Sequence, residues 1–510
     1  MESLRHILPE GLPVSLQVVV ASLIFGFVYS YISAERPLAG FPVIDVDNQG
    51  PKKTWLWHGR QAISEGLQKF SGPFQVVTGT GPKIVLPNRY ADELRNHPDL
   101  NFNKAFAKDF MVNYPGFEPH RQGLNNDYLI QDTVRIKLTQ SLNLVTDDLV
   151  DETIASVHDV FGDSPEWATR RIRDDMLEVV ARLSSRVFLG RNLCRHRRWL
   201  EIAKSYTVDS FLVSRLMRAA PPFLRPLVYL LIPQSWSLRR AVRDARTIID
   251  PEVRRRKAVV DAARARGEKP PKVADTIGWM YEVSGGREDA DLVAGQLSLT
   301  MAAIHTTTET TCQALLDICE YPEVAQQLRD EIVEVLGEHG WAKTTLYKLK
   351  LMDSFLKEGQ RFTPMGTVTM NRYVEKDITL SDGTLLPQGA RLMVASNFAD
   401  PTLYPSPATF DAARFLKLRQ APGHEHSWQF VTTSPAHTLF GHGQHACPGR
   451  FFASNEVKIA LCHLLLKYDW RFVPGRGRPA PRTFEAVNGV RDDAEIQCRR
   501  RRPEIDLDSL

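Results

Sequence analysis

The stretch Phe440-Gly-His-Gly-Gln-His-Ala-Cys-Pro-Gly-Arg-Phe-Phe452 decides the fold, because it places one cysteine between a glycine-rich loop and an apolar helix. Gly443 and Gly449 permit close backbone approach, so peptide N–H groups can point at the Cys447 sulfur. Pro448 suits the first turn of a helix, and the positive end of that helix would lower the pKa of the thiol. The pattern therefore predicts a thiolate that binds a metal. A half-buried structural cysteine is the ordinary alternative.

The composition is that of a globular protein and gives no electrostatic sign of a nucleic-acid partner. Of the 510 residues, 43% are hydrophobic and 24% are charged, which excludes a disordered or collagen-like chain. A formal net charge of +4 is too small to indicate binding to nucleic acid. Six cysteines without a C-x-x-C pair predict neither a disulfide framework nor a zinc site. We expect the remaining five to be structural: Cys194, Cys312, Cys319, Cys462 and Cys498.

Hydrophobic periodicity predicts a mainly α protein with a smaller β-rich region. Apolar residues recur at helical spacing over 131–162, 165–190, 236–265, 289–319, 323–337 and 449–467. Between 366 and 396 the pattern changes to short alternating runs around an Asp-Gly turn at 382–383, which predicts paired strands. We expect one large domain over 53–510.

The N-terminal region differs from the rest, because residues 12–32 carry no charge over 21 positions. A run of this length can cross a hydrocarbon core of about 30 Å, and no A-x-A cleavage pattern accompanies it. We therefore expect a short tail at 1–11, a transmembrane anchor at 12–32 and a Pro- and Gly-containing linker at 33–52. A cleaved signal peptide and a buried helix are the alternatives. A second apolar segment, 221–233, would dip into a membrane if exposed, and an ordinary packed connection is the equal alternative.

The cysteine loop resembles the haem-binding signature F-x-x-G-x-[R/H]-x-C-x-G of the cytochrome P450 superfamily, with Phe440, Gly443, His445, Cys447 and Gly449 in place. The resemblance implies the cytochrome P450 fold and a non-covalent haem b whose iron takes Cys447 as its axial thiolate. It also implies that Phe440 packs near the sulfur. His445 stands where arginine is usual, and it would hydrogen-bond a haem propionate with a charge that depends on pH.

An earlier segment, Ala302-Ala-Ile-His-Thr-Thr307, resembles the oxygen-activation motif of the family's central helix. Ala302 and Thr306 are four residues apart and share one helical face, which leaves room for dioxygen beside a hydroxyl. By this resemblance Thr306 would relay protons. His305 stands where the family usually has an acid, so either His305 moves protons or Thr306 and water do so without it. Hydroxyls bonded to their own helix backbone are the plainer alternative.

The segment Glu358-Gly-Gln-Arg361 matches the family's E-x-x-R pair, whose spacing puts both charges on one helical face. Arg414, in Phe410-Asp-Ala-Ala-Arg-Phe415, corresponds to the third member of the family's ion network. The resemblance implies a buried structural cluster that supports the haem loop from behind. Loss of one member would leave a buried charge unpaired, at a cost of about 3 to 5 kcal/mol.

Other site residues are carried over on weaker matches. Arg372 matches a basic residue that meets a haem propionate, and Arg135 has the same role only if Gln131 replaces the tryptophan of the family's W-x-x-x-R motif. The resemblance places substrate contacts at Ala303, Met365 and Phe484. The wider candidate regions are 106–124, 211–217, the helix around Ala302, 365–370 and 484–490.

The motif order and the residues around Cys447 are similar to filamentous-fungal members that hydroxylate steroids, terpenoids or related secondary metabolites. The expected protein is a single-pass monooxygenase of the endoplasmic reticulum membrane, with its catalytic domain in the cytosol and a hydrophobic small molecule as substrate. NADPH electrons would come from a separate NADPH-cytochrome P450 reductase, with cytochrome b5 as an optional donor, because no nucleotide or flavin fingerprint is found in the chain. A same-fold isomerase or dehydratase acting on a preoxidised substrate, and a non-catalytic haem-binding membrane protein, are the two alternatives.

Overall fold

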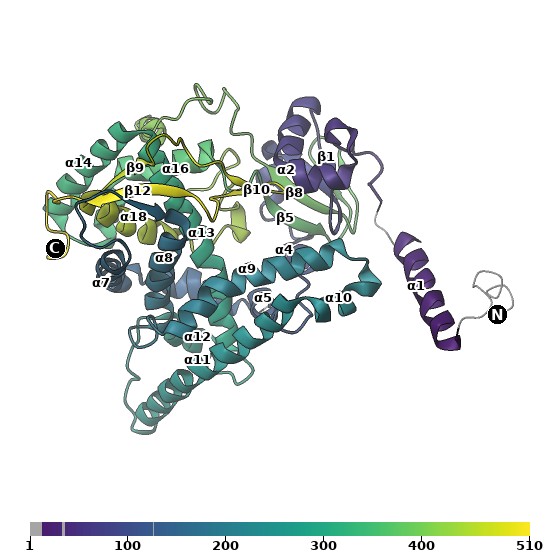
Figure 1. Ribbon diagram of the computed structural model, residues 1–510, viewed down its shortest axis with the longest axis horizontal. Coiled ribbons are helices and arrows are strands. Elements are labelled where there is room, and N and C mark those ends of the chain that lie inside the picture. Colours follow the sequence, from purple (N-terminus) through teal and green to yellow (C-terminus); the bar gives the residue numbers. More distant parts are fainter. Residues whose placement is uncertain (1–12, 33–35, 126) are drawn as a thin grey trace.

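The chain folds into a large helical region and a smaller region built around a sheet, which lie side by side in Figure 1. This computed structural model describes residues 13–32, 36–125 and 127–510. The expected fold class, mainly α with a smaller β-rich region, is therefore confirmed.

The helices occupy most of the chain. Up to residue 265 they are α1 (Val14–Ile32), α2 (Pro51–Lys69), α3 (Ala91–Leu94), α4 (Phe102–Phe110), α5 (Glu118–Gly123), α6 (Leu129–Asp132), α7 (Leu142–Phe161), α8 (Ile172–Leu189), α9 (Arg197–Ala219), α10 (Arg225–Leu231) and α11 (Pro233–Ala265). The later ones are α12 (Thr276–Val283), α13 (Leu292–Glu320), α14 (Pro322–His339), α15 (Lys343–Lys348), α16 (Lys350–Phe362), α17 (Arg414–Arg419) and α18 (Arg450–Lys467). Short 3-10 or π segments are η2 (Val46–Asn48), η3 (Asn88–Tyr90), η4 (Thr133–Leu138), η5 (Pro222–Leu224) and η6 (Gly443–His445).

The main sheet has the strand order β1-β2-β8-β5-β3, in which β2 and β8 are parallel and the other pairs are antiparallel. Its strands are β1 (Phe74–Thr78), β2 (Gly81–Pro87), β3 (Leu100–Asn101), β5 (Val368–Val374) and β8 (Arg391–Ala395). Three smaller sheets pair β4 (Ala168–Arg171) with β12 (Glu495–Arg500) and β9 (Tyr468–Phe472), β6 (Ile378–Thr379) with β7 (Leu385–Leu386), and β10 (Arg482–Phe484) with β11 (Val487–Gly489). The Asp-Gly turn expected at 382–383 joins β6 to β7, and Gly383 has the positive φ of +85° that such a turn requires.

Helix α13 runs through the helical region, and the site is built on it. The Asp291 carboxylate caps its first turn by accepting the N–H of Ala294 at 2.9 Å. The helix ends at Glu320, because Pro322 disfavours the helical conformation at the residue before it. Most of its side chains are buried, and α5, α8, α9 and α18 pack against it. The position of α13 is therefore fixed from several sides.

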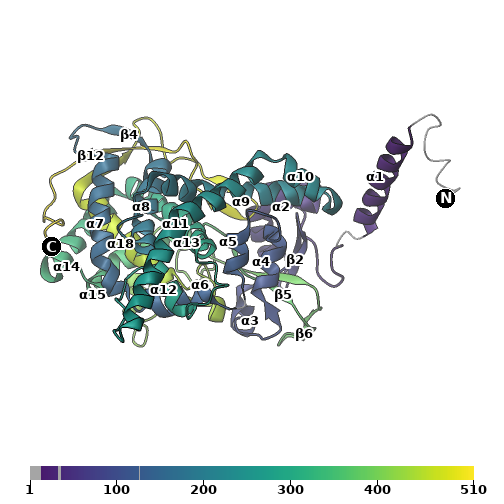
Figure 2. The same cartoon turned by 90° about the horizontal axis from the view of Figure 1, so that it is seen from below.

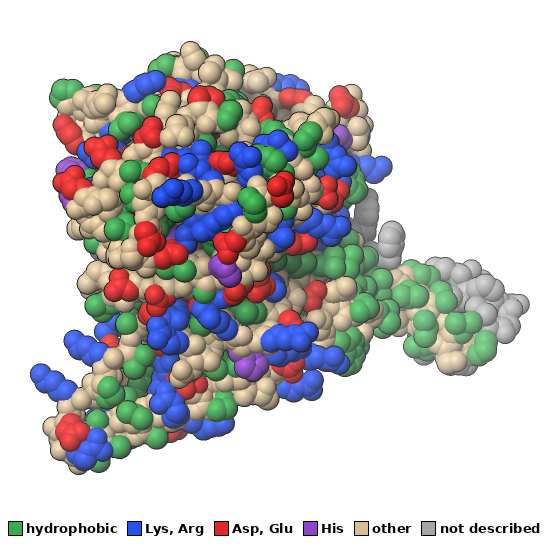
Figure 3. Space-filling model, turned by 60° about the vertical axis from the view of Figure 1, so that its left-hand side comes forward, with side chains coloured by type: hydrophobic (Ala, Val, Ile, Leu, Met, Phe, Trp, Pro, Cys, Tyr) green, Lys and Arg blue, Asp and Glu red, His purple; other side chains and the backbone are tan. Residues whose placement is uncertain are grey.

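Helix α1 lies outside the main body, next to η5 and α10 (Figure 2). Figure 3 shows hydrophobic side chains gathered on α1 and on the adjacent surface of the body. A Cβ added to Gly26 would lie 2.6 Å from the Phe223 ring, so only glycine allows this contact between α1 and η5.

Among the described residues, no helix is both long enough and apolar enough to cross a membrane. The transmembrane anchor expected at 12–32 is therefore not supported. The tail expected at 1–11 lies outside the described residues, as do 33–35 of the expected linker.

The rest of the expected linker is packed against the sheet. The Gln75 side chain on β1 donates to the carbonyls of Leu38 at 2.8 Å and Phe41 at 2.6 Å. Ile44 and Val46 are buried in the apolar cluster under α2. Residues 38–50 are thus part of the folded body and do not form a free spacer.

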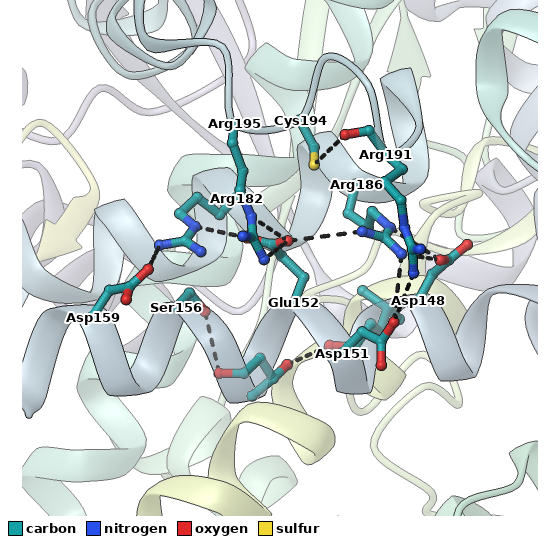
Figure 4. A network of polar contacts seen from close by, with 12 residues as sticks. Asp148, Asp151, Glu152, Ser156, Asp159, Arg182, Arg186, Arg191, Cys194 and Arg195 are labelled. Atoms are coloured by element: carbon teal, nitrogen blue, oxygen red, sulfur yellow. Dashed lines mark hydrogen bonds and ion pairs between the residues drawn. The ribbon is translucent and has the colours of Figure 1, made fainter. Parts of the chain in front are cut away.

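A buried ion cluster joins α7 to α8 (Figure 4), and we call Glu152, Arg182, Arg186 and Arg195 the α7–α8 cluster. The Glu152 side chain is fully buried and accepts Arg182 Nε at 2.7 Å and Arg195 Nε at 3.0 Å. Arg186 Nη2 lies 2.5 Å from a carboxylate oxygen of Asp148 at the rim of the cluster. The cluster therefore binds α7 and the loop after α8 to α8 itself.

Candidate functional site

A cavity of about 420 Å³ lies beside the middle of α13 and includes the cysteine selected from the sequence. Its wall comes from α13, α16, the start of α18, residues 363–369, Phe430, the cysteine loop and the segment 478–491. Ala302, Thr306, Met365, Phe440 and Cys447 all line it. A concave pocket that is mostly apolar and carries a few polar groups is the usual form of a cofactor or small-molecule site. Segments far apart in sequence thus converge on Cys447.

The cysteine loop brings backbone N–H groups close to the sulfur. It turns through η6, and the Cys447 N–H donates to the Phe440 carbonyl at 2.7 Å. Burial raises the pKa of the Cys447 thiol, and the N–H groups of Gly449 and Arg450 at the start of α18 only partly offset this effect. The start of α18 thus lowers the thiol pKa as expected, but burial outweighs this effect and the net shift is upward. A metal ion at the sulfur would remove the proton outright.

Gly443 allows the loop to lie directly on the chain that follows α3. Its φ is +77°, and an added Cβ would lie 2.5 Å from the Arg95 Cβ. The neighbouring Gln444 N–H donates to Asn96 Oδ1 at 2.8 Å. At Gly449 an added Cβ would meet Val134 of η4 at an ordinary 3.7 Å, so this glycine is less constrained.

Arg372, with the uncharged imidazole of His445 next to it, forms a basic corner beside the loop. Arg372 on β5 is buried, donates to the Asn371 carbonyl at 2.9 Å and forms no ion pair within the described part of the chain. Burial lowers the pKa of its guanidinium to about 10. Burial, followed by the Arg372 charge, lowers the pKa of His445 to about 4. The Phe102 ring lies next to both, with its centroid 5.8 Å from the Arg372 guanidinium carbon and 5.6 Å from the stacked His445 ring.

This corner fits an anionic ligand. A buried charge is normally paired, and a guanidinium binds carboxylates through charge-assisted hydrogen bonds. The propionate groups of a haem would provide such carboxylates. Arg372 and His445 lie beside the cysteine loop but are not part of the cavity wall. A corner for carboxylates next to an apolar cavity that contains Cys447 is consistent with a haem held through sulfur.

Thr306 and His305 point to different surroundings. Thr306 lines the cavity, and its Oγ1 donates to the Ala302 carbonyl at 2.8 Å within the same helix. His305 lies on another face of α13, where its Nε2 is 3.0 Å from the Lys204 carbonyl of α9. Burial lowers the pKa of His305 to about 4. The structure therefore does not bring His305 to the cavity. Of the two expected proton routes, the one through Thr306 and water fits this arrangement.

Glu358, Arg361 and Arg414, which we call the α16 cluster, are brought together in the core. Glu358 accepts Arg361 Nε at 2.8 Å and Arg414 Nε at 3.0 Å, and none of the three side chains is more than 6% exposed. Both arginines also donate to backbone carbonyls of the segment 398–409, which precedes Arg414. The cluster therefore holds α16 against the chain that leads to the cysteine loop.

Lys357 and Arg450 also support the loop, and the sequence did not single them out. Lys357 Nζ donates to the carbonyls of Gln429 and Thr432, both at 2.9 Å. Arg450 donates through Nη1 to the Cys447 carbonyl at 2.8 Å and through Nε to the Val431 carbonyl at 3.1 Å. The position of Arg450 beside the cysteine was a usable signal, whereas Lys357 looks like any charge on a helix.

Several expected residues lie away from the cavity. The Arg135 side chain is 66% exposed and pairs with Asp132 at 2.8 Å, so it does not reach the wall. Ala303 packs against the core, and Phe484 lies under Arg215, whose guanidinium carbon is 4.1 Å from the ring centroid. The regions 106–124 and 211–217 meet through Phe110 and Phe211, with ring centroids 5.0 Å apart, outside this cavity wall. Of the five cysteines expected to be structural, Cys194, Cys312, Cys462 and Cys498 are buried and Cys319 is half-buried.

Comparisons with known proteins agree with the chemistry that the site geometry suggests. The sequence model of the family described as Cytochrome P450 matches residues 108–492. The cytochrome P450 monooxygenase bsc2 of Alternaria brassicicola is 44% identical over 485 residues, which cover 93% of this chain and 92% of that protein. The cytochrome P450 monooxygenase bsc11 of the same fungus is 40% identical, covering 99% and 97% of the two chains. The cytochrome P450 monooxygenase adrA of Penicillium rubens is 40% identical, covering 89% of each.

Proposed function

Because the chain belongs to the cytochrome P450 family of monooxygenases, we propose that it hydroxylates a hydrophobic small molecule of fungal secondary metabolism, such as a steroid or a terpenoid. The observation that carries the proposal is one cavity wall that holds Cys447, Ala302 and Thr306 together. The similar proteins are fungal and are named as monooxygenases. This supports a substrate of fungal origin but does not indicate its chemical structure.

Haem b is the proposed cofactor, with Cys447 as the iron ligand, Phe440 beside the sulfur, and Arg372 and His445 facing the propionates. When bound, this haem supplies the activation of dioxygen for insertion of one oxygen atom into a C–H bond. The protein contributes the thiolate, the charge that balances the propionates, and a pocket that keeps water away.

The side chains of α13 give the cavity its proton chemistry. Ala302 is small and leaves space beside Thr306 on the same helical face. The Thr306 hydroxyl gives its own proton to the Ala302 carbonyl, so its oxygen can accept a hydrogen bond from water in the cavity. A positioned water on this hydroxyl is a route by which protons reach the reacting centre. The apolar side chains of Phe355, Leu356, Phe430 and Val457 line another part of the wall and keep water from it.

Location and electron supply are part of the proposal. We place the protein at the endoplasmic reticulum membrane, with its body in the cytosol and with NADPH-cytochrome P450 reductase as the electron donor, with or without cytochrome b5. Exposed apolar side chains on α1 and around α10 support contact with a lipid surface: Leu16, Val18, Val19, Leu23, Ile24, Leu227, Leu230 and Leu231. Retention of the protein on membranes after a high-salt wash, and its release in a Leu230→Asp and Leu231→Asp double variant, would test this placement.

The test of function is product analysis. The chain is expressed with a fungal reductase, membranes are supplied with NADPH and a steroid and terpenoid panel, and products are identified by mass spectrometry. We expect a product with one added oxygen atom that requires NADPH, O2 and the reductase. A product that is an isomer of its substrate and forms without O2 would contradict the proposal in favour of a rearrangement enzyme.

Thr306→Ala sharpens the same experiment. We expect this variant to keep consuming NADPH but to release more peroxide and less product, because the water that delivers protons loses its anchor. Thr306→Ser is the matched control. It keeps the hydroxyl and should therefore keep the coupling of NADPH consumption to product formation. Equal coupling in all three proteins would remove Thr306 from the mechanism.

A further inference from the structure

The segment 478–491, which we call the C-terminal wall, forms one side of the cavity but has little support from a sheet. Its strands β10 and β11 pair with each other. The hairpin backbone is also linked to residues 365–367, through the Gly366–Val487 bridge and the Asn488 N–H to the Met365 carbonyl at 2.7 Å, and to α2, through the Glu485 N–H to the Leu56 carbonyl at 3.3 Å. A two-stranded hairpin on its own is only marginally stable. Other contacts must therefore fix how close the C-terminal wall lies to α13.

Glu309 on α13 joins the C-terminal wall to α13 at the cavity. The Val490 N–H donates to Glu309 Oε2 at 2.7 Å, and Arg173 Nε from α8 donates to Oε1 at 3.0 Å. The Glu309 side chain is 12% exposed and the Arg173 side chain 9%. Both oxygens thus have a donor in a site largely shielded from water, where charge-assisted hydrogen bonds are strong.

The C-terminal wall lies directly against this carboxylate. A Cβ added to Gly489 would lie 3.4 Å from each Glu309 oxygen, which is ordinary van der Waals contact, so the wall packs on the carboxylate without a requirement for glycine. Val487, Asn488, Gly489 and Val490 line the same cavity as Thr306. Because Glu309 follows Thr306 by three residues, the proton-relay hydroxyl and the support of the wall belong to the same part of α13.

A second carboxylate holds the other end of the wall. Asp317 lies two helical turns after Glu309, and Arg478 Nη2 donates to its Oδ1 at 2.6 Å. This contact binds a side chain before the hairpin. Glu309 binds the backbone beside the residues that face the cavity, so a change at Glu309 moves the surface that a substrate would touch.

We propose that Glu309 is a specificity-determining positioning residue: by holding the Val490 backbone, with Arg173 fixing its carboxylate, it sets the distance of β11 from the space beside Thr306. The inference rests on the proposed function, because it places the substrate between β11 and α13. It adds a named residue that decides which substrate shapes are accepted.

The affinities of two iron-binding azoles test whether this distance has changed, and the test needs no knowledge of the substrate. Imidazole is small, whereas 4-phenylimidazole carries a ring that extends from the iron toward the cavity wall. Each is titrated into haem-loaded protein, and its Kd is taken from the shift of the Soret band. The variants are Glu309→Ala, which removes the support, and Glu309→Gln, which keeps the side-chain volume and one acceptor oxygen. Asp492→Asn is the matched control, because Asp492 also binds Arg173 but is 66% exposed and does not line the cavity.

We expect Glu309→Ala to change the Kd of 4-phenylimidazole by about fivefold or more while the Kd of imidazole stays within about twofold. Glu309→Gln should lie between Glu309→Ala and the wild-type protein, and Asp492→Asn should match the wild type for both azoles. This selective change is one that a general loss of stability does not produce.

Wild-type affinity for 4-phenylimidazole in both Glu309 variants would overturn the inference. So would an equal change for both azoles, because Glu309 would then act only on the overall structure. Wild-type protein that binds neither azole would contradict the proposed function itself. The two failures are therefore distinguishable.

Discussion

The α16 cluster and the α7–α8 cluster are built from the same parts, yet they stand in different relations to the site. In each, a fully buried glutamate accepts the Nε groups of two arginines at 2.7 to 3.0 Å. The arginines of the α16 cluster donate further to backbone carbonyls of residues 398–409. Those of the α7–α8 cluster reach Asp148 and Asp159 at the surface. The comparison shows that one kind of ion cluster can support either the site or only the helical body.

The difference follows from the neighbours of each glutamate. Helix α16 also contributes Phe355, Leu356 and Gln360 to the cavity wall, and Lys357 beside Glu358 holds the segment that carries Phe430. The α7–α8 cluster has no residue in that wall. We therefore expect damage to the α16 cluster to affect stability and haem retention together, and damage to the α7–α8 cluster to affect stability alone.

The largest effect is expected for Glu358→Ala. Two buried arginines lose their shared counter-ion, at a cost of about 3 to 5 kcal/mol, and the segment before the cysteine loop loses its support. Little haem-loaded protein should be recovered. The measurement is haem content per mole of protein with the ferrous–CO spectrum, and a normal yield with a normal thiolate band would contradict the account.

Glu152→Ala breaks the other cluster and is the matched comparison. We expect a loss of about 3 to 5 kcal/mol in the free energy of unfolding, because the buried Arg182 loses its buried partner. The protein that folds should still bind haem in the normal ratio and give an unchanged thiolate band. Haem loss equal to that of Glu358→Ala would show that the two clusters do not differ in function.

One of these clusters could be predicted from the sequence and the other could not, and the reason is physical. Glu358 and Arg361 are three residues apart on one helical face, so their contact is a local pattern, and the family resemblance supplied Arg414. Glu152 is 30 residues from Arg182 and 43 from Arg195, and no local pattern reports such a contact. The main fold class and the cysteine loop were predictable for the same local reason.

Other parts of the site depended on packing and could not be predicted. The face of α13 that carries His305 meets α9, a choice that depends on tertiary structure. The pKa of the Cys447 thiol depends on burial, which the loop pattern does not reveal. Glu309 and Arg173 are 136 residues apart, so the support of the C-terminal wall had no sequence signal.

A third buried glutamate, Glu456 on α18, has no arginine partner and sharpens the comparison. Ser184 Oγ donates to its Oε1 at 2.7 Å, while Oε2 has no partner among the described residues. Burial raises the pKa of Glu456 from 4.5 to about 8. The folded protein therefore keeps a proton that the unfolded chain releases above 4.5, so this contribution to stability is complete below pH 4.5 and is lost as pH rises toward 8.

Glu456→Gln should remove this pH dependence, because an amide has no proton to lose. We expect the variant to gain stability relative to the wild type as pH rises from about 5 to about 8, by about 1 to 4 kcal/mol at the upper end. Thermal unfolding of both proteins across this range measures the difference. A difference that does not grow with pH would contradict the assignment of a buried, protonated carboxyl.

The smallest effect is expected for Arg195→Ala. Its side chain is 54% exposed, so water already screens its bond to Glu152, and Arg182 remains as a partner. We expect a loss of about 0 to 1 kcal/mol in the free energy of unfolding. Denaturant unfolding measures it, and a loss as large as that of Glu152→Ala would mean that the buried pair depends on its exposed member.

The ferrous–CO absorption spectrum of the purified, haem-loaded protein tests the central claim most directly, since it reports the atom that binds iron opposite CO. The account predicts a thiolate-type band in the wild-type protein and its loss in Cys447→Ala. A wild-type band typical of a nitrogen ligand, or a thiolate band that persists in Cys447→Ala, would contradict it.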